Sequence, residues 1–386
     1  MKKLRISACL AVLLLLTGCW DIKDLQTINY ITSVGLDYKD GKFIIYAQML
    51  DFTSIAKQES GKVGQPPQQW VGKGTGETIN LAINDLYSTM QQKTLWSHIT
   101  SIVVSRAYLE QETTRMTDTF FRFRDIRYTP WVYGTHDSIE QLFSAPGFFN
   151  LTTLSTILNE PMENYEQSSF ILPIKYVEFI SEAREPDKTI LLPSISLNKE
   201  QWKKNEKNER KIIINGVFAI QNQSLKGWFG RESLNGSRWM ETETIRSPLS
   251  IKENGKINTV ISMGKPDIDI KFQNSKDQPR FSITININGN IIESIDSLSE
   301  SELVEKAQKQ IEKEVRSTYE AGLKKNADLY SLKHVLYRKH HFTWKQLRAK
   351  DQILLSQDSL QNIYVNVKLT HSGMLRTTPT DMPPEN

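Results

Sequence analysis

Cysteine is nearly absent from this chain of 386 residues, which contains only Cys9 and Cys19. Both lie near the N-terminus, inside or just after a short apolar run. If that run is a leader removed after residue 18, Cys9 leaves with it and Cys19 becomes the first residue. No thiol pair then remains for a disulfide, a redox couple or a cysteine-ligated metal. The fold must therefore be held by its core.

Long hydrophobic runs are also scarce. The apolar stretch Ile6–Leu16 has 11 residues, and Trp20-Asp21 follows it closely. A membrane-spanning helix needs about 20 apolar residues. No later run approaches that length, so we expect the body of the chain to lie outside the bilayer.

Neither sign of charge dominates the chain. There are 48 Lys and Arg residues against 44 Asp and Glu, a formal charge of +4. Removing residues 1–18 takes away three basic residues and no acidic ones, which lowers the charge to +1. A nearly neutral chain gives no reason to expect nucleic-acid binding. The 368 residues that remain are more than one core usually serves, so two or three domains are expected.

Sequence motifs for catalysis are missing. There is no Gly-x-Ser-x-Gly elbow for a serine nucleophile and no His-Glu-x-x-His for zinc. The glycine-rich stretch Gly72-Lys73-Gly74-Thr75-Gly76 precedes a predicted helix, but its spacing fits neither a phosphate loop nor a dinucleotide fingerprint. We interpret it as the end of a flexible loop over Ser54–Gly76.

Histidines and carboxylates also give no concentrated site. We interpret His334, His340 and His341 as part of a basic helical surface, because adjacent histidines point in different directions on a helix. His98 is predicted to be a partnered core histidine. The pair Glu241/Glu243 is placed on a surface strand. The sequence thus predicts no enzyme, no metal and no cofactor.

The N-terminus instead has the parts of a bacterial export signal. Three basic residues precede the apolar stretch, and Leu16-Thr17-Gly18-Cys19 closes it in the pattern of a lipoprotein signal. We predict cleavage between Gly18 and Cys19, with a diacylglycerol and an N-acyl chain attached to Cys19. Two or more acyl chains give stable membrane attachment. The alternative is an ordinary signal peptide in which Cys19 has no role.

The first half of the mature chain predicts an α/β layer. Two strands, Ile28–Tyr38 and Lys42–Leu50, flank Asp40-Gly41, which is a hairpin signal. Helices and strands then alternate, which favours at least one crossover connection. The predicted elements are a helix at Thr78–Gln91, a strand at Ile99–Ser105, a helix at Ala107–Phe123, a strand at Trp131–Thr135 and helices at Ser138–Phe143 and Tyr176–Glu182.

The second half is rich in predicted strands and contains the best helix. Lys199–Lys211 is almost wholly polar, which indicates a solvated linker or a hairpin tip. Within Ser301–Lys325, apolar residues recur every four positions. The predicted division is a signal peptide at 1–18, an N-terminal α/β domain at 19–198, a polar linker at 199–211, a middle strand-rich domain at 212–278, a C-terminal domain with the long helix at 279–375 and a disordered tail at 376–386.

Several segments, in order and with compatible spacing, carry a resemblance that covers nearly the whole mature chain. It resembles the Ger(x)C family, the lipoprotein C subunits of nutrient germinant receptors in spore-forming bacteria. The segment Gln223–Gly227 departs from the family pattern, which leaves the subtype open. The matching segments are Gly18-Cys19-Trp20-Asp21, Ile31–Tyr38, Ser97–Arg127 with its Arg124-Asp125-Ile126-Arg127 ending, Asn215–Ser233, Asn326-Ala327-Asp328 and His371-Ser372-Gly373.

The resemblance implies an elongated ectodomain of three α/β (α+β) domains with mixed sheets. It implies attachment to the outer face of the spore's inner membrane, and a complex with an A subunit and a multi-spanning B subunit. It does not imply catalysis, and it carries over only one functional residue, Cys19. Arg124, Asp125 and Arg127 are interpreted as structural, with partner contact as the alternative. The expected function is therefore receptor assembly or signal relay in germination. The alternatives are a solute-binding lipoprotein with a pocket between two lobes, and an envelope hydrolase.

Overall fold

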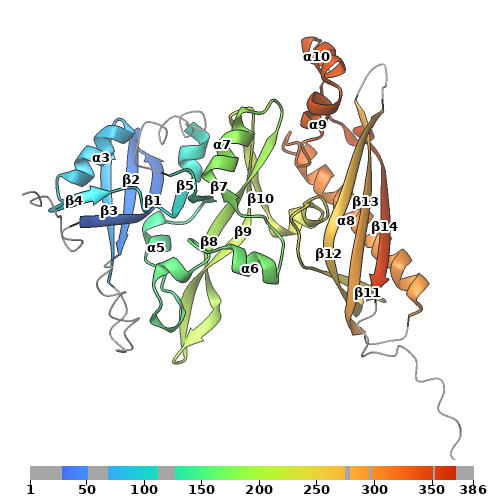
Figure 1. The fold of residues 1–386 in the computed structure, drawn as a ribbon, viewed down its shortest axis with the longest axis horizontal. Coiled ribbons are helices and arrows are strands. Elements are labelled where there is room, and N and C mark those ends of the chain that lie inside the picture. The colour runs from blue at the N-terminus through green and yellow to red at the C-terminus, as the bar shows by residue number, and fades with distance from the viewer. Residues whose placement is uncertain are drawn as a thin grey trace, which may run out of the picture.

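The computed structural model describes residues 28–50, 68–111, 127–273, 279–294, 298–350 and 353–370. These residues form two β-sheets that follow one another along the long axis of the molecule (Figure 1). The first sheet has ten strands, in the order β10-β9-β8-β6-β5-β1-β2-β3, with β4 paired to β1 and β7 to β6. The second has the order β11-β12-β13-β14. The mixed α/β class predicted from the sequence is confirmed.

The predicted N-terminal hairpin is present. Strands β1 (Ile28–Lys39) and β2 (Lys42–Leu50) pair antiparallel. Asp40 and Gly41 connect them with φ values of 52° and 77°. Two successive residues with positive φ make the turn whose twist matches that of the flanking strands.

The interpretation of Ser54–Gly76 as a flexible loop is wrong for its last part. Gln69–Gly76 is strand β3, which pairs antiparallel with β2, and helix α3 (Ile79–Tyr87) packs on it. A Cβ on Gly74 would lie 2.1 Å from the carbonyl oxygen of Ala82 on that helix. The glycines therefore allow the helix to approach the strand closely, and they do not form a phosphate loop.

Parallel strands form the centre of the first sheet. Strand β5 (Ser101–Ser105) runs parallel to β1 and to β6 (Trp131–Thr135), as expected for crossover connections. Of the helix predicted at Ala107–Phe123, residues 106–111 are helical and residues 112–126 lie outside the described ranges. The other elements of this region are β4 (Lys93–Leu95), α5 (Ile139–Phe143), α6 (Met162–Gln167), β7 (Ile174–Lys175) and α7 (Tyr176–Arg184).

The polar segment 199–211 is the outer half of a long hairpin, so the hairpin-tip interpretation is confirmed and the assignment of 199–211 as a linker between domains is wrong. Strands β8 (Thr189–Lys204) and β9 (Lys207–Gln221) pair antiparallel, and Asn205 and Glu206 take positive φ values at the turn. Strand β10 (Ser224–Gly230) completes the sheet. The segment has no apolar alternation because both faces of the projecting hairpin meet solvent. The boundary expected between residues 198 and 212 therefore falls inside one sheet.

The two sheets are joined by a segment that follows β10. It contains the short 3₁₀ helices η4 (Arg231–Leu234) and η5 (Ser237–Trp239). Strands β11 (Ser247–Glu253), β12 (Lys256–Gln273), β13 (Arg280–Ser294) and β14 (Leu360–Thr370) then form the second sheet. The boundary expected between residues 278 and 279 falls between the paired strands β12 and β13. The described residues thus form two sheet-based units where the resemblance implied three domains.

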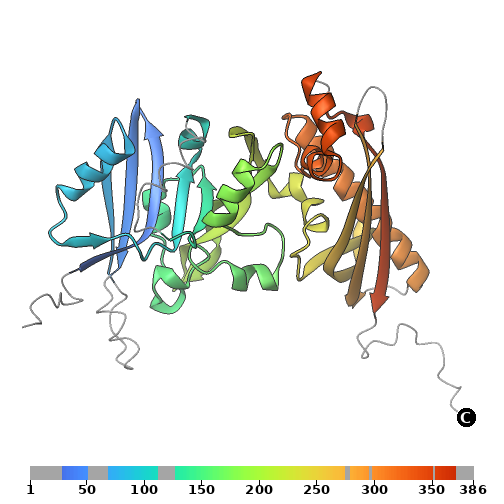
Figure 2. The same cartoon turned by 45° about the horizontal axis from the view of Figure 1, so that its top comes forward.

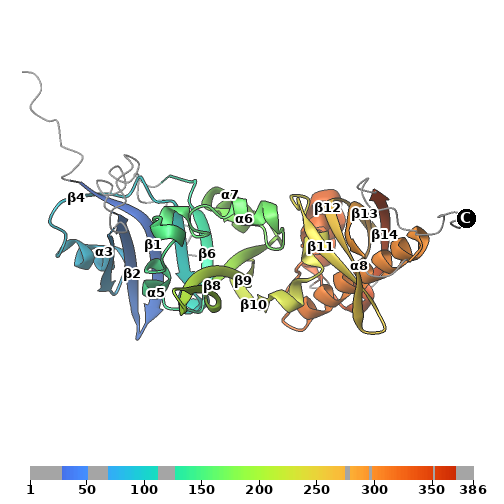
Figure 3. The same ribbon diagram turned by 90° about the horizontal axis from the view of Figure 1, so that it is seen from below.

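The predicted long helix covers one face of the second sheet. Helix α8 (Glu300–Leu323) begins with a capping box, in which Ser299 and Glu302 bond each other's backbone N–H. Its buried residues Leu303, Ala307 and Ile311 repeat every four positions and pack with the inward residues of the strands. Figures 2 and 3 show this helix lying across the sheet. Helices α9 (Leu332–Lys339) and α10 (His341–Ala349) follow it.

Candidate functional site between the two sheets

A cavity of about 910 Å³ lies where the two sheets meet. Strands β7 and β8 and helix α7 line it from the first sheet, and β12 and α9 line it from the second. Cavities of this size at the junction of two structural units are common ligand sites. Its apolar lining includes Met162, Phe170, Leu191, Val217, Ile268, Ile270 and Val335.

Four glutamates and three lysines are among the lining residues, including Glu182, Glu241 and Lys188. Burial raises the pKa of Glu182, and Lys188 Nζ, 3.5 Å from Glu182 Oε1, partly offsets that rise. Burial also raises the pKa of Glu241, whose Oε1 accepts the backbone N–H of Glu243 at 3.0 Å. Thr189 Oγ1 is buried against the cavity and has no hydrogen-bond partner among the described residues. These groups suit a small ligand with a polar, positively charged part.

Chemistry beyond binding has little support in this cavity. Among the described residues that line it there is no histidine or cysteine to activate a hydroxyl group. Of its four carboxylates, Glu182 pairs with Lys188 and Glu241 accepts a backbone N–H. The arrangement is that of a binding cleft or a joint between two bodies.

Hydrogen bonds on two sides of the cavity connect the sheets. Ser331, before α9, accepts the backbone N–H of Thr189 at 3.1 Å. Ser169 Oγ accepts the backbone N–H groups of Ile245 and Arg246 at 3.0 and 3.1 Å. Nδ1 of His334 lies 2.9 Å from the carbonyl oxygen of Pro186. These contacts fix how the second sheet sits on the first.

The Asp187 side chain joins two separate elements at this junction. It is buried in the turn before β8, with a φ of 57°. Its Oδ1 accepts Nδ2 of Asn222 at 3.0 Å, and its Oδ2 accepts Nε1 of Trp344 at 2.7 Å. One carboxylate thus bridges the β9–β10 turn and helix α10.

A second buried carboxylate lies at the start of α9. Burial raises the pKa of Asp328 to about 6, and the negative charge of Asp187 adds to the effect. Its Oδ2 accepts the backbone N–H of Lys333 at 2.8 Å, whereas its Oδ1 has no hydrogen-bond partner within the described ranges. The junction therefore contains a group that titrates near neutral pH.

The residues predicted to be functional do not gather here. Cys19 and Gly18, predicted for lipidation and cleavage, lie outside the described residues, as do Arg124 and Asp125. Arg127 is exposed. Lipidation and cleavage therefore stay predictions.

The three histidines near the C-terminal helices take part in aromatic contacts, and His334 and His341 both contact the ring of Tyr337. His340 packs against the ring of Phe272, and His341 stacks on Trp344. The prediction of a core position for His98 is wrong, because this residue is exposed; its ring meets the edge of Tyr30, and its Nδ1 lies 3.1 Å from Ser97 Oγ. Within the ranges that the structure describes, no three His, Cys, Asp or Glu residues come together as a metal site.

The surface strand predicted at Glu241/Glu243 is also wrong, because residues 241–246 form an irregular segment beside the cavity. Sequence reasoning noticed this pair but gave it no role, and it missed Glu182 and Lys188. Glu182 and Lys188 lie six residues apart, but Glu241 is more than fifty residues further along the chain, so no local spacing marks the three together. Searching the described helices for one long and apolar enough to cross a membrane gives none.

Comparison with known proteins accounts for nearly all of this chain. Residues 21–197 match the profile described as "Spore germination protein N-terminal domain", and residues 215–373 match "Spore germination B3/ GerAC like, C-terminal". The chain belongs to the Ger(x)C family. The first profile covers most of the ten-stranded sheet, and the second covers all of the four-stranded sheet. Membership identifies a spore germination protein of the kind that forms germinant receptors.

Relatives in Bacillus subtilis (strain 168) agree with this assignment. "Spore germination protein A3" is 22% identical over 224 residues, which cover 57% of this chain and 56% of that protein, so this alignment spans about half of that relative. "Putative spore germination protein YfkR" is 22% identical over 96% of both chains. "Spore germination protein KC" is 20% identical over 88% of this chain and 89% of the relative.

A solved structure shares the fold. The crystal structure of the GerBC protein matches with a TM-score of 0.52 and 12% identity, covering 91% of this chain and 100% of that one. At this identity the likeness shows the fold alone. It supports the arrangement of mixed sheets described above.

Proposed function

We propose that this protein is a lipid-anchored, non-catalytic subunit of a spore nutrient germinant receptor, and that it supports assembly of the receptor or relays its signal. The observation that carries the proposal is the match of both Ger(x)C profiles, in order, along one chain. The lipoprotein pattern at Leu16-Thr17-Gly18-Cys19 supplies the anchor.

The mechanism we propose is positional. Lipid on Cys19 holds the ectodomain at the outer face of the spore's inner membrane. Confinement to a surface raises the effective concentration of the subunit for an A subunit and a multi-spanning B subunit. No catalytic step is needed, which agrees with a junction built for contact and binding.

Germination assays on spores with a single receptor set test this function. We compare the wild type with a deletion and with Cys19→Ala, and use a trigger that bypasses nutrient receptors as the control. Loss of the nutrient response alone, in both mutants, is the expected result. A matched control is Cys9→Ala, because Cys9 lies in the leader and leaves the mature chain unchanged. Normal nutrient germination in the deletion strain would overturn the proposal.

A second candidate is favoured by the cavity between the sheets. A solute-binding lipoprotein needs a pocket between two lobes, and this cavity combines an apolar wall with Glu182, Lys188 and Glu241. Equilibrium dialysis of the mature chain against labelled amino acids and sugars tests it. Saturable binding that Glu241→Gln weakens would support this candidate. If none of these compounds binds, the solute-binding candidate is rejected and the cavity is only part of the contact region between the two sheets.

A further inference from the structure

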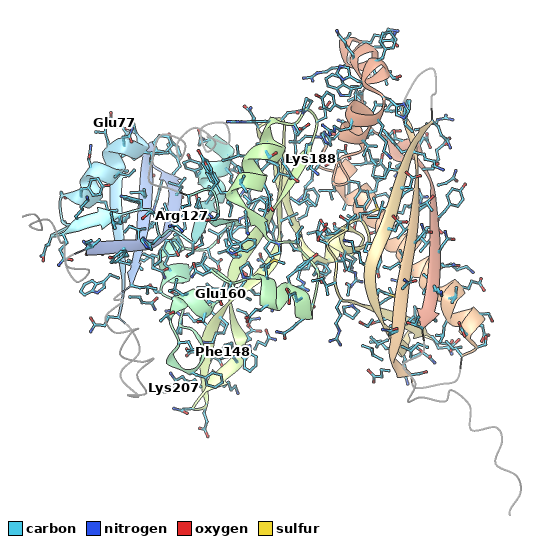
Figure 4. The ribbon with its side chains drawn as sticks, in the orientation of Figure 1. Glu77, Arg127, Phe148, Glu160, Lys188 and Lys207 are labelled. Carbon is cyan, nitrogen blue, oxygen red and sulfur yellow. The ribbon has the colours of Figure 1, made fainter. Side chains whose placement is uncertain are left out.

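Three aromatic side chains are exposed where the β8–β9 hairpin projects from the side of the molecule (Figure 1). Phe149 is 93% exposed, Trp202 48% and Phe148 41%. Figure 4 shows Phe148 close to Lys207, which lies at the hairpin turn. Phe149 also has a φ of 52°, a left-handed conformation that is strained for a bulky side chain. Strain of this kind persists only where the surrounding structure holds it.

The loop that carries these rings is fixed in place. Lys211 Nζ donates hydrogen bonds to the carbonyl oxygens of Pro146 and Gly147 at 2.9 and 3.0 Å. The same ammonium group lies 4.4 Å from the centre of the Phe148 ring. Phe148 meets Trp202 edge to face at 4.9 Å. The contacts of Lys211 and Phe148 thus hold the loop in a conformation in which Phe149 faces solvent.

The register of the hairpin places basic residues beside the rings. Trp202 lies opposite Glu209, and Lys204 lies opposite Lys207. Directly paired residues and residues two apart share a face of a strand pair. Trp202, Lys204, Lys207, Glu209 and Lys211 therefore share one face of the hairpin. Glu209 Oε1 lies 3.7 Å from Lys211 Nζ, so Lys204 and Lys207 are the lysines of this face that remain outside that ion pair.

Positive charge is concentrated in this segment. Residues 199–211 contain six Lys and Arg and three Glu, a net charge of +3. The whole mature chain carries only +1, so the rest of it is net negative. The hairpin is therefore an electrostatic exception within the protein.

We propose that this hairpin tip, defined as Phe148, Phe149, Trp202 and the basic residues of 199–211, binds an anionic lipid surface. Exposed aromatic rings flanked by lysines are the combination that partitions into membrane interfaces. The rings project, and Lys204 and Lys207 on the same face as Trp202 are exposed, which fits a fluid headgroup layer better than a shaped protein pocket. The contact would orient the ectodomain on the bilayer.

This inference rests on the proposed function in one respect, which is that a lipid bilayer lies close to the protein. Eight residues lie between Cys19 and Ile28, the first residue of β1, so nine Cα-to-Cα steps connect them. An extended segment of that length spans at most about 30 Å. An anchor on Cys19 would thus keep the ectodomain near the surface that the tip binds.

Vesicle sedimentation of the chain without its leader and with Cys19→Ala tests the tip alone, because no lipid is then attached. Residues 28–370 contain both sheets and their cores, so this chain keeps the fold. We expect binding to vesicles that contain phosphatidylglycerol, weakened by salt, and little binding to phosphatidylcholine alone. Phe149→Ser is expected to lower the partition by about tenfold, and Lys207→Glu by at least about fivefold.

Phe342→Ser is the matched control, since Phe342 is 73% exposed but lies on α10, far from the tip in the sequence. Equal binding of the Phe149 and Phe342 variants, or no binding to anionic vesicles, would overturn the proposal. Unchanged vesicle binding by the Phe149 variant, together with loss of its nutrient response in spores, would instead assign the tip to a protein partner. The vesicle assay uses a protein without a lipid anchor. A negative result there would reject membrane binding by the tip, whereas the receptor function is tested separately by the germination assay.

Discussion

Trp344 Nε1 donates a hydrogen bond of 2.7 Å to Asp187 Oδ2, across 157 residues of sequence. Trp344 belongs to α10, which follows the long helix, and Asp187 precedes β8 of the ten-stranded sheet. Both side chains are buried. The bond therefore couples the C-terminal helices to the first sheet, and it sits beside the cavity whose shape depends on how the two sheets meet.

Replacing Trp344 by Phe tests that coupling. The variant keeps most of the ring volume but leaves a buried carboxylate oxygen of Asp187 without its donor, a loss of about 1–3 kcal/mol in the free energy of unfolding. Urea denaturation followed by circular dichroism measures it. Trp70→Phe, at a 62% exposed position, should cause almost no change. Equal stability of the two variants would show that the bond contributes nothing.

Stability should fall as pH rises from about 4 to 6. Burial raises the pKa of Asp328 to about 6, above the ordinary 3.8, so the folded state holds this proton more tightly than the unfolded state. The stability that Asp328 contributes is fully present below the pKa of the group in the unfolded chain, and it is lost as the pH rises through the pKa in the folded protein. For this group the loss in the free energy of unfolding is about 3 kcal/mol. Burial raises the pKa of Glu182 and Glu241 in the same direction.

Asp328→Asn isolates this effect, because an amide oxygen can still accept the backbone N–H of Lys333 but does not titrate. Urea midpoints of both proteins between pH 4 and pH 8 provide the measurement. We expect the fall from pH 4 to pH 6 to be much smaller in the variant. A variant that loses as much stability as the wild type over this range would exclude Asp328 as the cause.

Gly74→Ala should destabilise the first sheet. Its new methyl group would lie 2.1 Å from a backbone oxygen and 2.7 Å from a backbone nitrogen of α3, so the helix must shift. Overpacking of this kind costs about 1–3 kcal/mol or more. In Gly264→Ala the nearest atom is 3.7 Å away, so thermal unfolding should separate the two variants. Similar melting temperatures would contradict the close helix–strand approach.

Arg238→Met should weaken the join between η5 and α8. Arg238 Nη2 lies 3.0 Å from Glu314 Oε2, and both side chains are about nine-tenths buried. Breaking a buried ion pair by removing one partner costs about 3–5 kcal/mol. Lys309→Met removes the exposed pair with Glu305 and should cost less than about 1 kcal/mol. Denaturant melts of the two variants compare these losses, and equal effects would refute the assignment.

Local signals in the sequence were sufficient for several elements. Asp40-Gly41 between alternating strands predicted the hairpin, and the four-residue spacing in Ser301–Lys325 predicted α8, because both signals arise between neighbours in the chain. The ordered motifs identified the family. Strand β3 was missed because its glycines serve contact with a helix and hide the usual strand composition.

The sequence by itself determined the local elements, the predicted anchor at Cys19 and the membership in the Ger(x)C family, because each depends on residues that are close together or in fixed order. Only the tertiary structure decided that 199–211 is a hairpin within one sheet, and that Glu182, Lys188 and Glu241 line a common cavity. The physical reason is that pairing and burial there depend on contacts between distant segments. Such contacts leave no period or spacing in the sequence.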